Sequence, residues 1–459
     1  MTPLQAELVP FTRGNGIELA PLEQEPAFPH FRRIVGNVDW IATGGLDFVY
    51  CDKMLKMEPE FQEAIDELFR VVKVGGHVAF HLDKHDFDAR PSCGWSEIVS
   101  KDLEDGMLTV YRKRDDERQV FAHPAKHEKT CAIFRAGAFG DMVQMSSILP
   151  ELKRQGYHVK LYTTVRGYEI AQSDPLIDEF VVLDDNQVPN IWLTEYFQYL
   201  TKTHAKFVNL CESVEGTFLT VPGRPLSFWP KEARHAVCDK NYVEMHHMIA
   251  GVPFKTNEGR FVATDEEKAW AKAELASMGG FPRILWATAG SSLHKVWPYM
   301  DAVIARILIA WPHAMVTLAG DGFSQAIIEP PWAAEPRVHL RGGVWTIRQT
   351  LAVAQQSDIV IGPETGVMSA VAMLPMPKVV LLSHSTVENL TRDWQNCYAI
   401  FSTKTECWPC HKLIHTWADC NRDEATGVAK CQADIPADAV WAALTDALKI
   451  KQVPIARVA

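Results

Sequence analysis

The sequence lacks any uninterrupted apolar stretch of about 18 residues, which is the length that marks a candidate membrane-spanning helix. Its first residues, MTPLQAELVPFTRGNG, also lack the basic segment and following apolar run of a secretory signal peptide. Neither an internal repeat nor a low-complexity tract is visible. We therefore expect a cytoplasmic protein without a membrane span, in which the ten cysteines are mostly reduced.

Positive charge is also scarce. The formal net charge of -11 at pH 7 argues against a protein that holds nucleic acid mainly through a large basic field. Lys153, Arg154, Lys160 and Arg166 would allow a local basic groove, although a solvated surface is the simpler interpretation of these residues. With 459 residues, of which 47% are hydrophobic and 22% charged, the chain has an ordinary globular composition and a length that predicts two or three domains.

The pattern of residues 1–122 predicts a small α/β domain. Its elements alternate between continuous apolar runs, typical of strands, and one stretch with apolar residues at helical spacing. Glycine pairs commonly end helices, so Gly75 and Gly76 predict a helix end. The predicted elements are a strand at LDFVYC (46–51), a helix from Phe61 to the glycine pair, and a strand at HVAFHL (77–82). The polar, proline-containing stretch 121–130 is interpreted as a linker.

Two further α/β domains are predicted, at 130–275 and at 276–459, each Rossmann-like. Short apolar runs that end in glycine, serine or a polar turn are typical of strands buried in a parallel sheet. Such sheets bind ligands outside the carboxyl ends of their strands, so two in succession predict a cleft. A final helix is expected at 436–450. Strands are predicted within CAIFRAG (131–137), HVKLYTT (158–164), FVVLD (180–184), AKFVNLC (205–211), RILWATAG (283–290), MVTLAGDG (315–322), DIVIGPETG (358–366) and KVVLLSHS (378–385).

The first candidate site is RAGAFGD (135–141), where a predicted strand ends and a helix begins. Asp141 lies in the first turn of that helix. An acid there either caps the helix or acts as a general base that removes a proton from an acceptor hydroxyl, and local sequence weighs the two equally. Arg135, Phe139 and Gly140 form the predicted acceptor-side loop, in which glycine permits close approach of a ligand.

The second candidate site is the turn TAGSSLHKVWP (288–298). It would bring free backbone N–H groups and a lysine to one point, an arrangement that suits a diphosphate. Gly290, Ser291, Ser292 and Lys295 are therefore predicted to bind the donor, with the lysine neutralising charge on a departing nucleotide. The simpler alternative is that Lys295 is an exposed lysine at the start of a helix.

The third candidate site follows the predicted strand DIVI (358–361). Thr365 supplies a hydroxyl, Gly366 permits close approach to a phosphate, and Glu364 is suited to holding ribose or sugar hydroxyls. Ser369 and Gly320, the latter in the turn after another predicted strand, complete the predicted donor-binding set. A turn with a helix cap explains any one of these residues, but three such turns at successive strand ends predict one nucleotide-binding cleft.

From about Cys131 to Ile450 the chain resembles the heptosyltransferases, glycosyltransferase family 9, whose members have the GT-B fold. The resemblance is carried by R-x-x-x-x-G-D before a proline-containing helix, by G-S-S-x-x-K-x-W-P, and by a D-T-G-like turn before a helix of small residues. It implies that Asp141 is the general base and that Lys295 contacts the donor phosphates. It also implies that Thr365 and Gly366 line the diphosphate site.

Two positions depart from the family pattern. Glu364 stands where the family usually has aspartate, and Ser369 stands where it has a histidine. These departures leave the donor open, including whether it is ADP-heptose.

The first segment is similar in part to class I methyltransferases, through LDFVYCDKMLKM and ELFRVVKVGGHVAF. That family has a glycine-rich loop after its first strand, and only Arg13 to Leu19, with Gly14 and Gly16, is available for it here. We interpret the segment as a shortened, inactive methyltransferase-like domain for docking or acceptor recognition. A bifunctional methyltransferase–glycosyltransferase is the alternative.

A cysteine cluster lies near the C-terminus, with one C-x-x-C pair, two further cysteines, and His411 and His415 nearby. Four such thiols are a candidate structural zinc site, while reduced thiols and a disulfide are the alternatives. The four cysteines are Cys407, Cys410, Cys420 and Cys431.

The function predicted from the sequence is inverting transfer of a sugar from a nucleotide-diphosphate donor, of the ADP-heptose type, to an acceptor hydroxyl. No metal or other cofactor is expected in catalysis, because GT-B enzymes use helix dipoles and cations at the leaving group. The acceptor is expected to be a saccharide, with a hydroxylated base in modified DNA as another class. A non-catalytic protein that binds nucleotide sugars is a further alternative.

Overall fold

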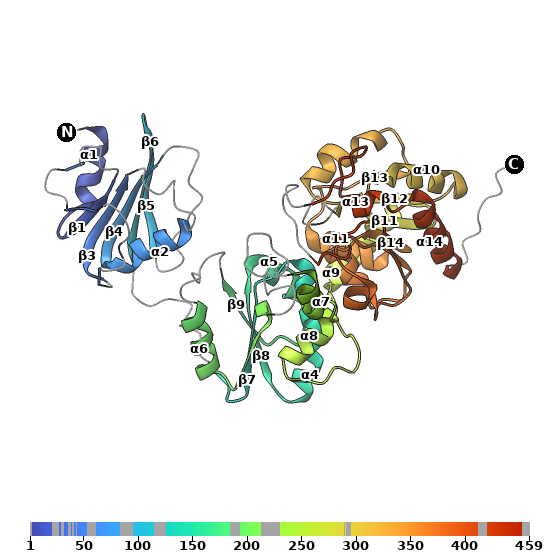
Figure 1. Cartoon of the computed structure of the whole chain (residues 1–459), viewed down its shortest axis with the longest axis horizontal. Helices are drawn as coiled ribbons and strands as arrows, with labels where there is room; N and C mark the ends of the chain where they lie inside the picture. Colours follow the sequence, from blue (N-terminus) through green and yellow to red (C-terminus); the bar gives the residue numbers. More distant parts are fainter. Residues whose placement is uncertain are drawn as a thin grey trace. The chain divides into compact units, whose positions relative to one another are not determined.

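The chain divides into two compact units, residues 1–128 with 181–205, and residues 129–180 with 206–459. Figure 1 shows the computed structural model coloured along the sequence. It describes residues 2–20, 27–28, 32–34, 38, 41–42, 44–52, 61–82, 95–113, 125–183, 193–212, 230–288, 290, 295–411 and 420–451. Residues 121–124 of the predicted linker lie outside these ranges. No helix within them is both long and apolar enough to cross a membrane.

The first unit is built on a mixed sheet with the strand order β2-β1-β3-β4-β6-β5. The first four strands are parallel, and β6 is antiparallel to both of its neighbours. The strand predicted at LDFVYC is confirmed as β3, and Val49 and Cys51 pack with Ile65 and Leu68 of α2 in one core. The elements are α1 (Pro3–Leu8), η1 (Val9–Phe11), β1 (Gly16–Leu19), β2 (Arg32–Ile34), β3 (Leu46–Asp52), α2 (Phe61–Val71), β4 (Val72–Leu82), β5 (Trp95–Leu103), β6 (Gly106–Lys113) and α6 (Leu193–Thr203).

The predicted end of α2 is wrong. The helix ends at Val71 and β4 begins at Val72, so the glycine pair lies inside a strand. The β-branched residues Val72 and Val74 favour extended backbone. The register against β3 shifts here, and Gly75 has a φ of 82°, which glycine adopts without strain. The glycines therefore form an irregularity within the strand instead of a helix stop.

The segment from Arg13 to Leu19 also differs from its interpretation as a loop after the first strand. Gly16 to Leu19 form β1 itself, in the interior of the sheet between β2 and β3. A Cβ on Gly16 would overlap the ring of Phe48, so the glycine at this position allows β1 to pair closely with β3. The glycines of this segment thus serve strand packing.

The second unit contains two lobes, and the N-lobe (129–180 and 206–278) carries a sheet with the order β10-β7-β8-β9. The strands predicted at 131–137, 158–164, 180–184 and 205–211 are confirmed. The helix predicted after β7 is interrupted before α4, whose first turn contains Pro150, a residue without a backbone N–H. The elements are β7 (Thr130–Arg135), α3 (Phe139–Met145), η4 (Ser146–Ile148), α4 (Leu149–Arg154), β8 (His158–Thr164), α5 (Val165–Ala171), β9 (Glu179–Leu183), β10 (Lys206–Asn209), η6 (Leu210–Glu212), α7 (Lys231–Cys238), α8 (Tyr242–Ile249) and α9 (Asp265–Met278).

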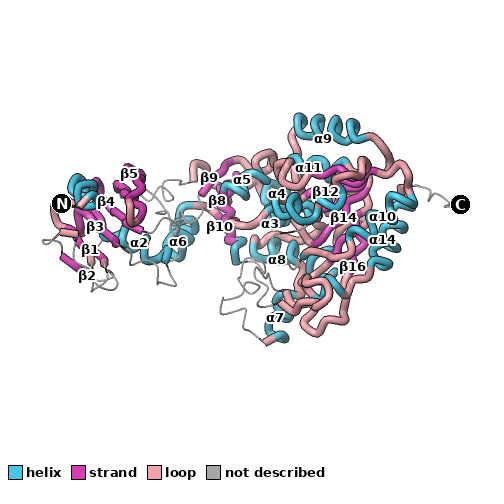
Figure 2. Tube along the Cα trace, turned by 90° about the horizontal axis from the view of Figure 1, so that it is seen from above, coloured by secondary structure: helices cyan, strands magenta, loops and turns pink. Residues whose placement is uncertain are grey.

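The C-lobe (279–451) carries a parallel sheet with the order β13-β12-β11-β14-β15-β16, which confirms the four strands predicted there. Alternate residues of β11 face opposite layers: Ile284 and Trp286 pack with α10 and α14, and Leu285 packs with α11 and α12. Figures 1 and 2 show α10 and α14 side by side. The elements are β11 (Arg283–Ala287), α10 (Met300–Ala310), β12 (Met315–Ala319), η9 (Ser324–Ile328), η10 (Pro330–Trp332), β13 (Val338–Leu340), α11 (Ile347–Gln356), β14 (Ile359–Pro363), α12 (Gly366–Val371), β15 (Lys378–Leu381), η11 (Val387–Thr391), β16 (Cys397–Ile400), α13 (Lys430–Ala433) and α14 (Ala437–Ile450).

One apolar core continues from the N-lobe into the C-lobe and includes Met142 of α3 and Met368 of α12. The buried guanidinium of Arg348 on α11 reinforces it. Arg348 binds the carboxylate of Glu267 on α9 at 2.6 and 2.7 Å, and donates to the carbonyl oxygen of Glu169 on α5 at 2.8 Å. These contacts hold the two lobes together on the side where α3 and α12 begin.

Candidate active site

Asp141 lies in the first turn of α3, directly after β7. Its Oδ2 accepts the backbone N–H of Ala138 at 2.6 Å, and its Oδ1 lies 3.3 Å from Nη2 of Arg135. Arg135 is buried and also donates to the carbonyl oxygen of Leu210. The Asp141 side chain is 22% exposed. The carboxylate therefore caps the helix and still reaches solvent, so its geometry accommodates both roles considered for it.

Gly137 makes this placement of Asp141 possible. A Cβ at residue 137 would lie 2.5 Å from both Cβ and Oδ2 of Asp141. Contacts that close do not occur between real side chains, so any other residue would push the carboxylate away from Ala138. The glycine in the sequence R-A-G-A-F-G-D is thus needed for the carboxylate to fold back over the turn.

Lys295 is buried, so the alternative that it is an exposed lysine at a helix start is wrong. Its Nζ donates to the carbonyl oxygen of Glu364 at 2.9 Å. Two residues later, Trp297 stacks on Trp286 of β11 and donates its indole N–H to the carbonyl oxygen of Ile435 at 3.0 Å. This anchor fixes the backbone two residues after the lysine. The predicted donor residues Ser291 and Ser292 lie outside the described residues.

Glu364 directly follows β14 and is 4% exposed. Its Oε1 accepts the backbone N–H groups of Ser383 and His384, each at 2.9 Å, and the Ser383 hydroxyl. Burial raises the pKa of Glu364, but the charges of His384 and Lys295 and the Ser383 hydrogen bond outweigh it and lower the pKa to about 2. The carboxylate is therefore ionised at neutral pH, and its Oε1 is saturated by the protein.

The other oxygen of Glu364 is in a different state. Oε2 is buried and has no hydrogen-bond partner among the described residues, and the same holds for the hydroxyl of Thr365, the next residue along the chain. A buried polar atom without a partner costs free energy, so two adjacent ones mark a place where a ligand or water completes the hydrogen bonding.

The glycines show how closely the predicted residues converge. A Cβ on Gly290 would lie 2.8 Å from Cδ of Lys295 and 3.1 Å from Cγ2 of Thr365. A Cβ on Gly366 would lie 2.8 Å from Cβ of Phe139, and one on Gly140 would lie 3.3 Å from Oγ of Ser369. Most of the predicted site thus comes together around the starts of α3 and α12, which contact each other across the lobes.

Gly320 is placed differently. It follows β12, and a Cβ there would overlap Oγ of Ser324 and lie 2.5 Å from Oγ1 of Thr288 at the end of β11. Thr288 in turn donates to the Ser324 hydroxyl at 2.7 Å. The glycine therefore lies in a packed turn at the same edge of the sheet.

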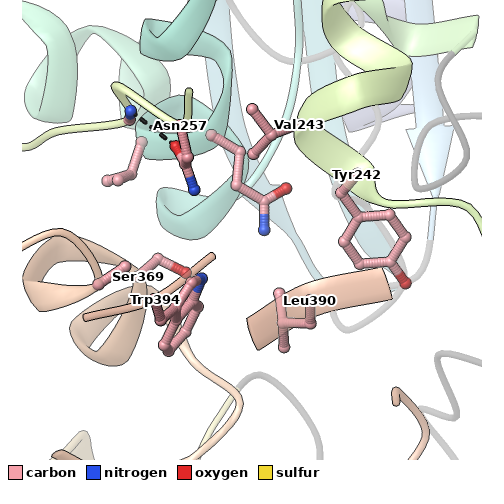
Figure 3. Close-up of a pocket in the computed structure, with 10 residues that line it drawn as sticks. Tyr242, Val243, Asn257, Ser369, Leu390 and Trp394 are labelled. Atoms are coloured by element: carbon pink, nitrogen blue, oxygen red, sulfur yellow. Dashed lines mark hydrogen bonds between the residues drawn. The ribbon is translucent and has the colours of Figure 1, made fainter. Parts of the chain in front are cut away.

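A small cavity lies one helical turn beyond these contacts (Figure 3). Val243 and Asn257 of the N-lobe line one side, and Ser369 and Trp394 of the C-lobe line the other. Its volume of about 10 Å³ holds about one water molecule, so it is not the nucleotide site. Gln144 also lines it, and the buried side-chain oxygen of Gln144 has no hydrogen-bond partner within the described ranges.

Of the four cysteines predicted as a zinc site, Cys407 is exposed and the other three are half-buried. Burial, followed by the neighbouring thiols of Cys410, Cys420 and Cys407, raises the pKa of Cys431, so the four lie near one another. Within the described part of the chain, the groups of three possible ligand atoms that lie within 4.8 Å of one another contain no cysteine.

Sequence reasoning missed three residues that shape the site. Ser383 and His384 hold the Glu364 carboxylate, and His411 N–H donates to the carbonyl oxygen of His384 at 3.0 Å. The signal for the first two was available, since they stand in the polar turn after β15. That strand pairs with β14, which Glu364 directly follows. His411 carries no comparable signal, because its contacts come from distant segments.

Two lobes with parallel sheets, joined through helices that begin at neighbouring strand ends, define a GT-B-like fold. Solved structures share it. The ADP-heptose lps heptosyltransferase II of E. coli is 15% identical, with a TM-score of 0.50, and the match covers 71% of this chain and 100% of that one. A glycosyl transferase family 9 protein from Veillonella parvula DSM 2008 is 14% identical, with a TM-score of 0.52, covering 72% of this chain and 100% of that one. No protein-family model matches the chain, and no curated protein does. At these identities the likeness establishes the fold.

Proposed function

We propose that the second unit is an inverting glycosyltransferase that moves a sugar from a nucleotide-diphosphate donor to a hydroxyl of a saccharide acceptor. One observation carries the proposal. A buried ammonium, Lys295, donates to the carbonyl oxygen of Glu364, where the starts of α3 and α12 meet. Two buried oxygens of the same turn, Glu364 Oε2 and Thr365 Oγ1, have no hydrogen-bond partner among the described residues. Positive charge suits a diphosphate, and a carboxylate oxygen with free lone pairs suits a sugar or ribose hydroxyl.

The chemistry needs one base and one stabilised leaving group. The carboxylate of Asp141 would take the proton of the acceptor hydroxyl, and the acceptor oxygen would form a bond to the anomeric carbon of the donor. The bond between that carbon and the phosphate oxygen would break on the opposite side, so the configuration inverts. The nucleoside diphosphate would leave with the bonding electrons, and Lys295 would offset its charge without a metal ion.

The proposed donor is of the ADP-heptose type. The fold likeness to the ADP-heptose lps heptosyltransferase II of E. coli supports this choice, as does the order of the motifs around Asp141, Lys295 and Thr365. Glu364 is longer than aspartate by one methylene, and the turn at Ser383 holds its carboxylate in place. A sugar hydroxyl that binds to its Oε2 must therefore lie where this longer side chain reaches.

Thermal unfolding tests the proposal. The purified protein is heated with ADP, UDP, GDP, CDP and their available sugar conjugates, and with S-adenosylmethionine as the competing ligand class. A diphosphate at 100 times its dissociation constant is expected to stabilise the fold by about 2.7 kcal/mol, which raises Tm measurably. A shift with one nucleotide base supports the transferase and identifies the donor. A shift with S-adenosylmethionine alone would contradict it and assign the activity to the first unit.

We further propose that the first unit is a shortened methyltransferase-like domain without catalysis, used for docking or acceptor recognition. The strand β1 ends at Leu19, and the sequence has no glycine from Ala20 to Val35. A loop that approaches a cofactor closely there would need glycine.

The cysteine cluster is proposed as a structural zinc site, because thiolates are the ligands that Zn²⁺ prefers. The thiols of Cys410, Cys420 and Cys407 lie close enough to Cys431 to contribute, after burial, to its raised pKa, and a single ion would need this proximity. Elemental analysis of protein purified without chelator is expected to find about one zinc per chain, and much less in Cys407→Ser/Cys410→Ser. Cys51→Ser, a buried cysteine of the first unit, is the control. Equal zinc in all three proteins, or none in the wild type, would refute the site.

A further inference from the structure

The loop that contains the C-x-x-C pair is fastened to the rest of the second unit through its backbone. From α7, Lys231 Nζ donates to the carbonyl oxygen of Glu406 at 3.1 Å, and His235 Nε2 lies 2.9 Å from the carbonyl oxygen of Pro409. Thr405 donates its hydroxyl to the carboxylate of Asp434 at 2.8 Å. Residues of α7 and Asp434 therefore fix this loop, which carries the proposed metal ligands.

His411, directly after the second cysteine of the pair, is the most buried member of the loop, with no exposed surface. Its φ is 52°, in the left-handed region that few side chains adopt. Its imidazole is held at both nitrogens: Nδ1 lies 3.1 Å from Nδ2 of Asn389, and Nε2 lies 2.7 Å from Oδ1 of Asp239. An unusual backbone conformation held from two sides indicates a constrained position.

The hydrogen-bond network fixes the proton on the ring. Asn389 Oδ1 accepts the backbone N–H of Thr386, and its Nδ2 donates to the carbonyl oxygen of Cys238, so Nδ2 is the group that faces His411. His411 Nδ1 must then accept, and its Nε2–H donates to Asp239. The ligand atoms of His235, Asp239 and His411 lie within 4.8 Å of one another, but the proton on Nε2 makes this a hydrogen-bond chain and not a metal site.

The backbone of His411 continues the chain to the donor site. Its N–H donates to the carbonyl oxygen of His384 at 3.0 Å, while the N–H of His384 donates to Oε1 of Glu364 at 2.9 Å. The imidazole of His384 is itself positioned beside that carboxylate, with Nε2 at 3.5 Å from Oε1. One peptide segment, 383–385, thus contacts the cysteine loop on one side and the candidate donor-binding carboxylate on the other.

We propose that His411 is a positioning residue that sets the Glu364 carboxylate for the donor, and that it thereby couples the state of the cysteine loop to donor binding. The coupling rests on the donor site proposed above. Because His411 holds the 383–385 segment in place, a change in the loop moves the two N–H groups that fix Oε1. Glu364 Oε2 then shifts with respect to Lys295, and a ligand that needs both loses affinity.

Two variants remove the hydrogen bond between His411 and Asp239, one from each of its two residues. His411→Asn keeps an acceptor for Asn389 and a residue type that tolerates positive φ, but it loses the link to Asp239. Asp239→Ala removes the same hydrogen bond, and because the Asp239 side chain is half-exposed, this substitution disturbs the fold less. Both are expected to weaken ADP binding, measured by titration calorimetry, by roughly 3- to 30-fold. His313→Asn, at an exposed histidine, is the control and is expected to bind like the wild type.

A double-mutant cycle separates positioning from general destabilisation. In a Glu364→Gln background the effect of His411→Asn on ADP affinity is expected to fall below about 2-fold, because the carboxylate through which it acts is gone. Equal effects in both backgrounds, or unchanged affinity in both single variants, would overturn the coupling while leaving the donor site intact. A wild type that binds no nucleoside diphosphate would overturn the proposed function, and the coupling with it.

Discussion

Asp141→Asn is expected to lower the rate of sugar transfer by about 10³-fold while nucleotide binding persists. Asparagine keeps the size of the side chain and can still accept the N–H of Ala138, so the start of α3 is preserved. It cannot take a proton from a hydroxyl. The loss should therefore appear in kcat for transfer, with the nucleotide-induced rise in Tm retained. The value of kcat is measured as the release of nucleoside diphosphate in the presence of acceptor and saturating donor.

A second first-turn acid provides the matched control for this variant. Asp265 begins α9 and is almost fully exposed, so Asp265→Asn alters a comparable helix start far from any site residue and should leave the rate unchanged. If Asp141 were only a helix cap, Asp141→Asn, which keeps the acceptor for the N–H of Ala138, would leave kcat near that of the wild type. That result would remove the general base from the proposal.

The strands of the second unit could be predicted from the sequence because each is a continuous apolar run buried on both faces, as in β11 and β14. The first unit was harder to predict. The hairpin of β5 and β6 was not predicted, since β5 contains no buried residue and so no continuous apolar run. The glycine pair after α2 was assigned to a helix end. The local sequence does not reveal whether a glycine ends a helix or lies at an irregularity within a strand, because the irregularity depends on pairing with the neighbouring strand.

For the candidate site, too, some features could be predicted from local sequence and others depend on distant segments. The placement of Asp141, Lys295 and Thr365 after strands was predictable, since parallel strands bring their carboxyl ends to one edge of a sheet. Their roles stay predictions. The burial of Lys295 and the saturation of one Glu364 oxygen were not predictable, because both depend on segments up to 69 residues away in the sequence. His411 illustrates the limit most clearly, for its side chain is held by Asp239, 172 positions earlier.

Lys295→Met is expected to abolish the Tm rise caused by nucleoside diphosphates and to lower kcat/KM by about 10²- to 10³-fold. Methionine preserves the apolar stem that packs against Gly290 but removes the ammonium. The donor diphosphate then loses its buried positive charge. Glu364 also loses one of the charges that lower its pKa, after that of His384; because that pKa is about 2, the carboxylate remains ionised at neutral pH and the fold should survive.

Lys272→Met is the control, since Lys272 is exposed on α9 and its loss should change neither quantity. Lys295→Arg tests geometry separately from charge: the wider guanidinium must displace its neighbours in a buried position, so partial recovery of binding without recovery of kcat is expected. If Lys295→Met bound nucleotide like the wild type, the lysine would serve only to hold the carbonyl oxygen of Glu364 at 2.9 Å. Water would then have to supply the hydrogen bonds that Glu364 Oε2 and Thr365 Oγ1 lack among the described residues. The donor would bind at another strand end.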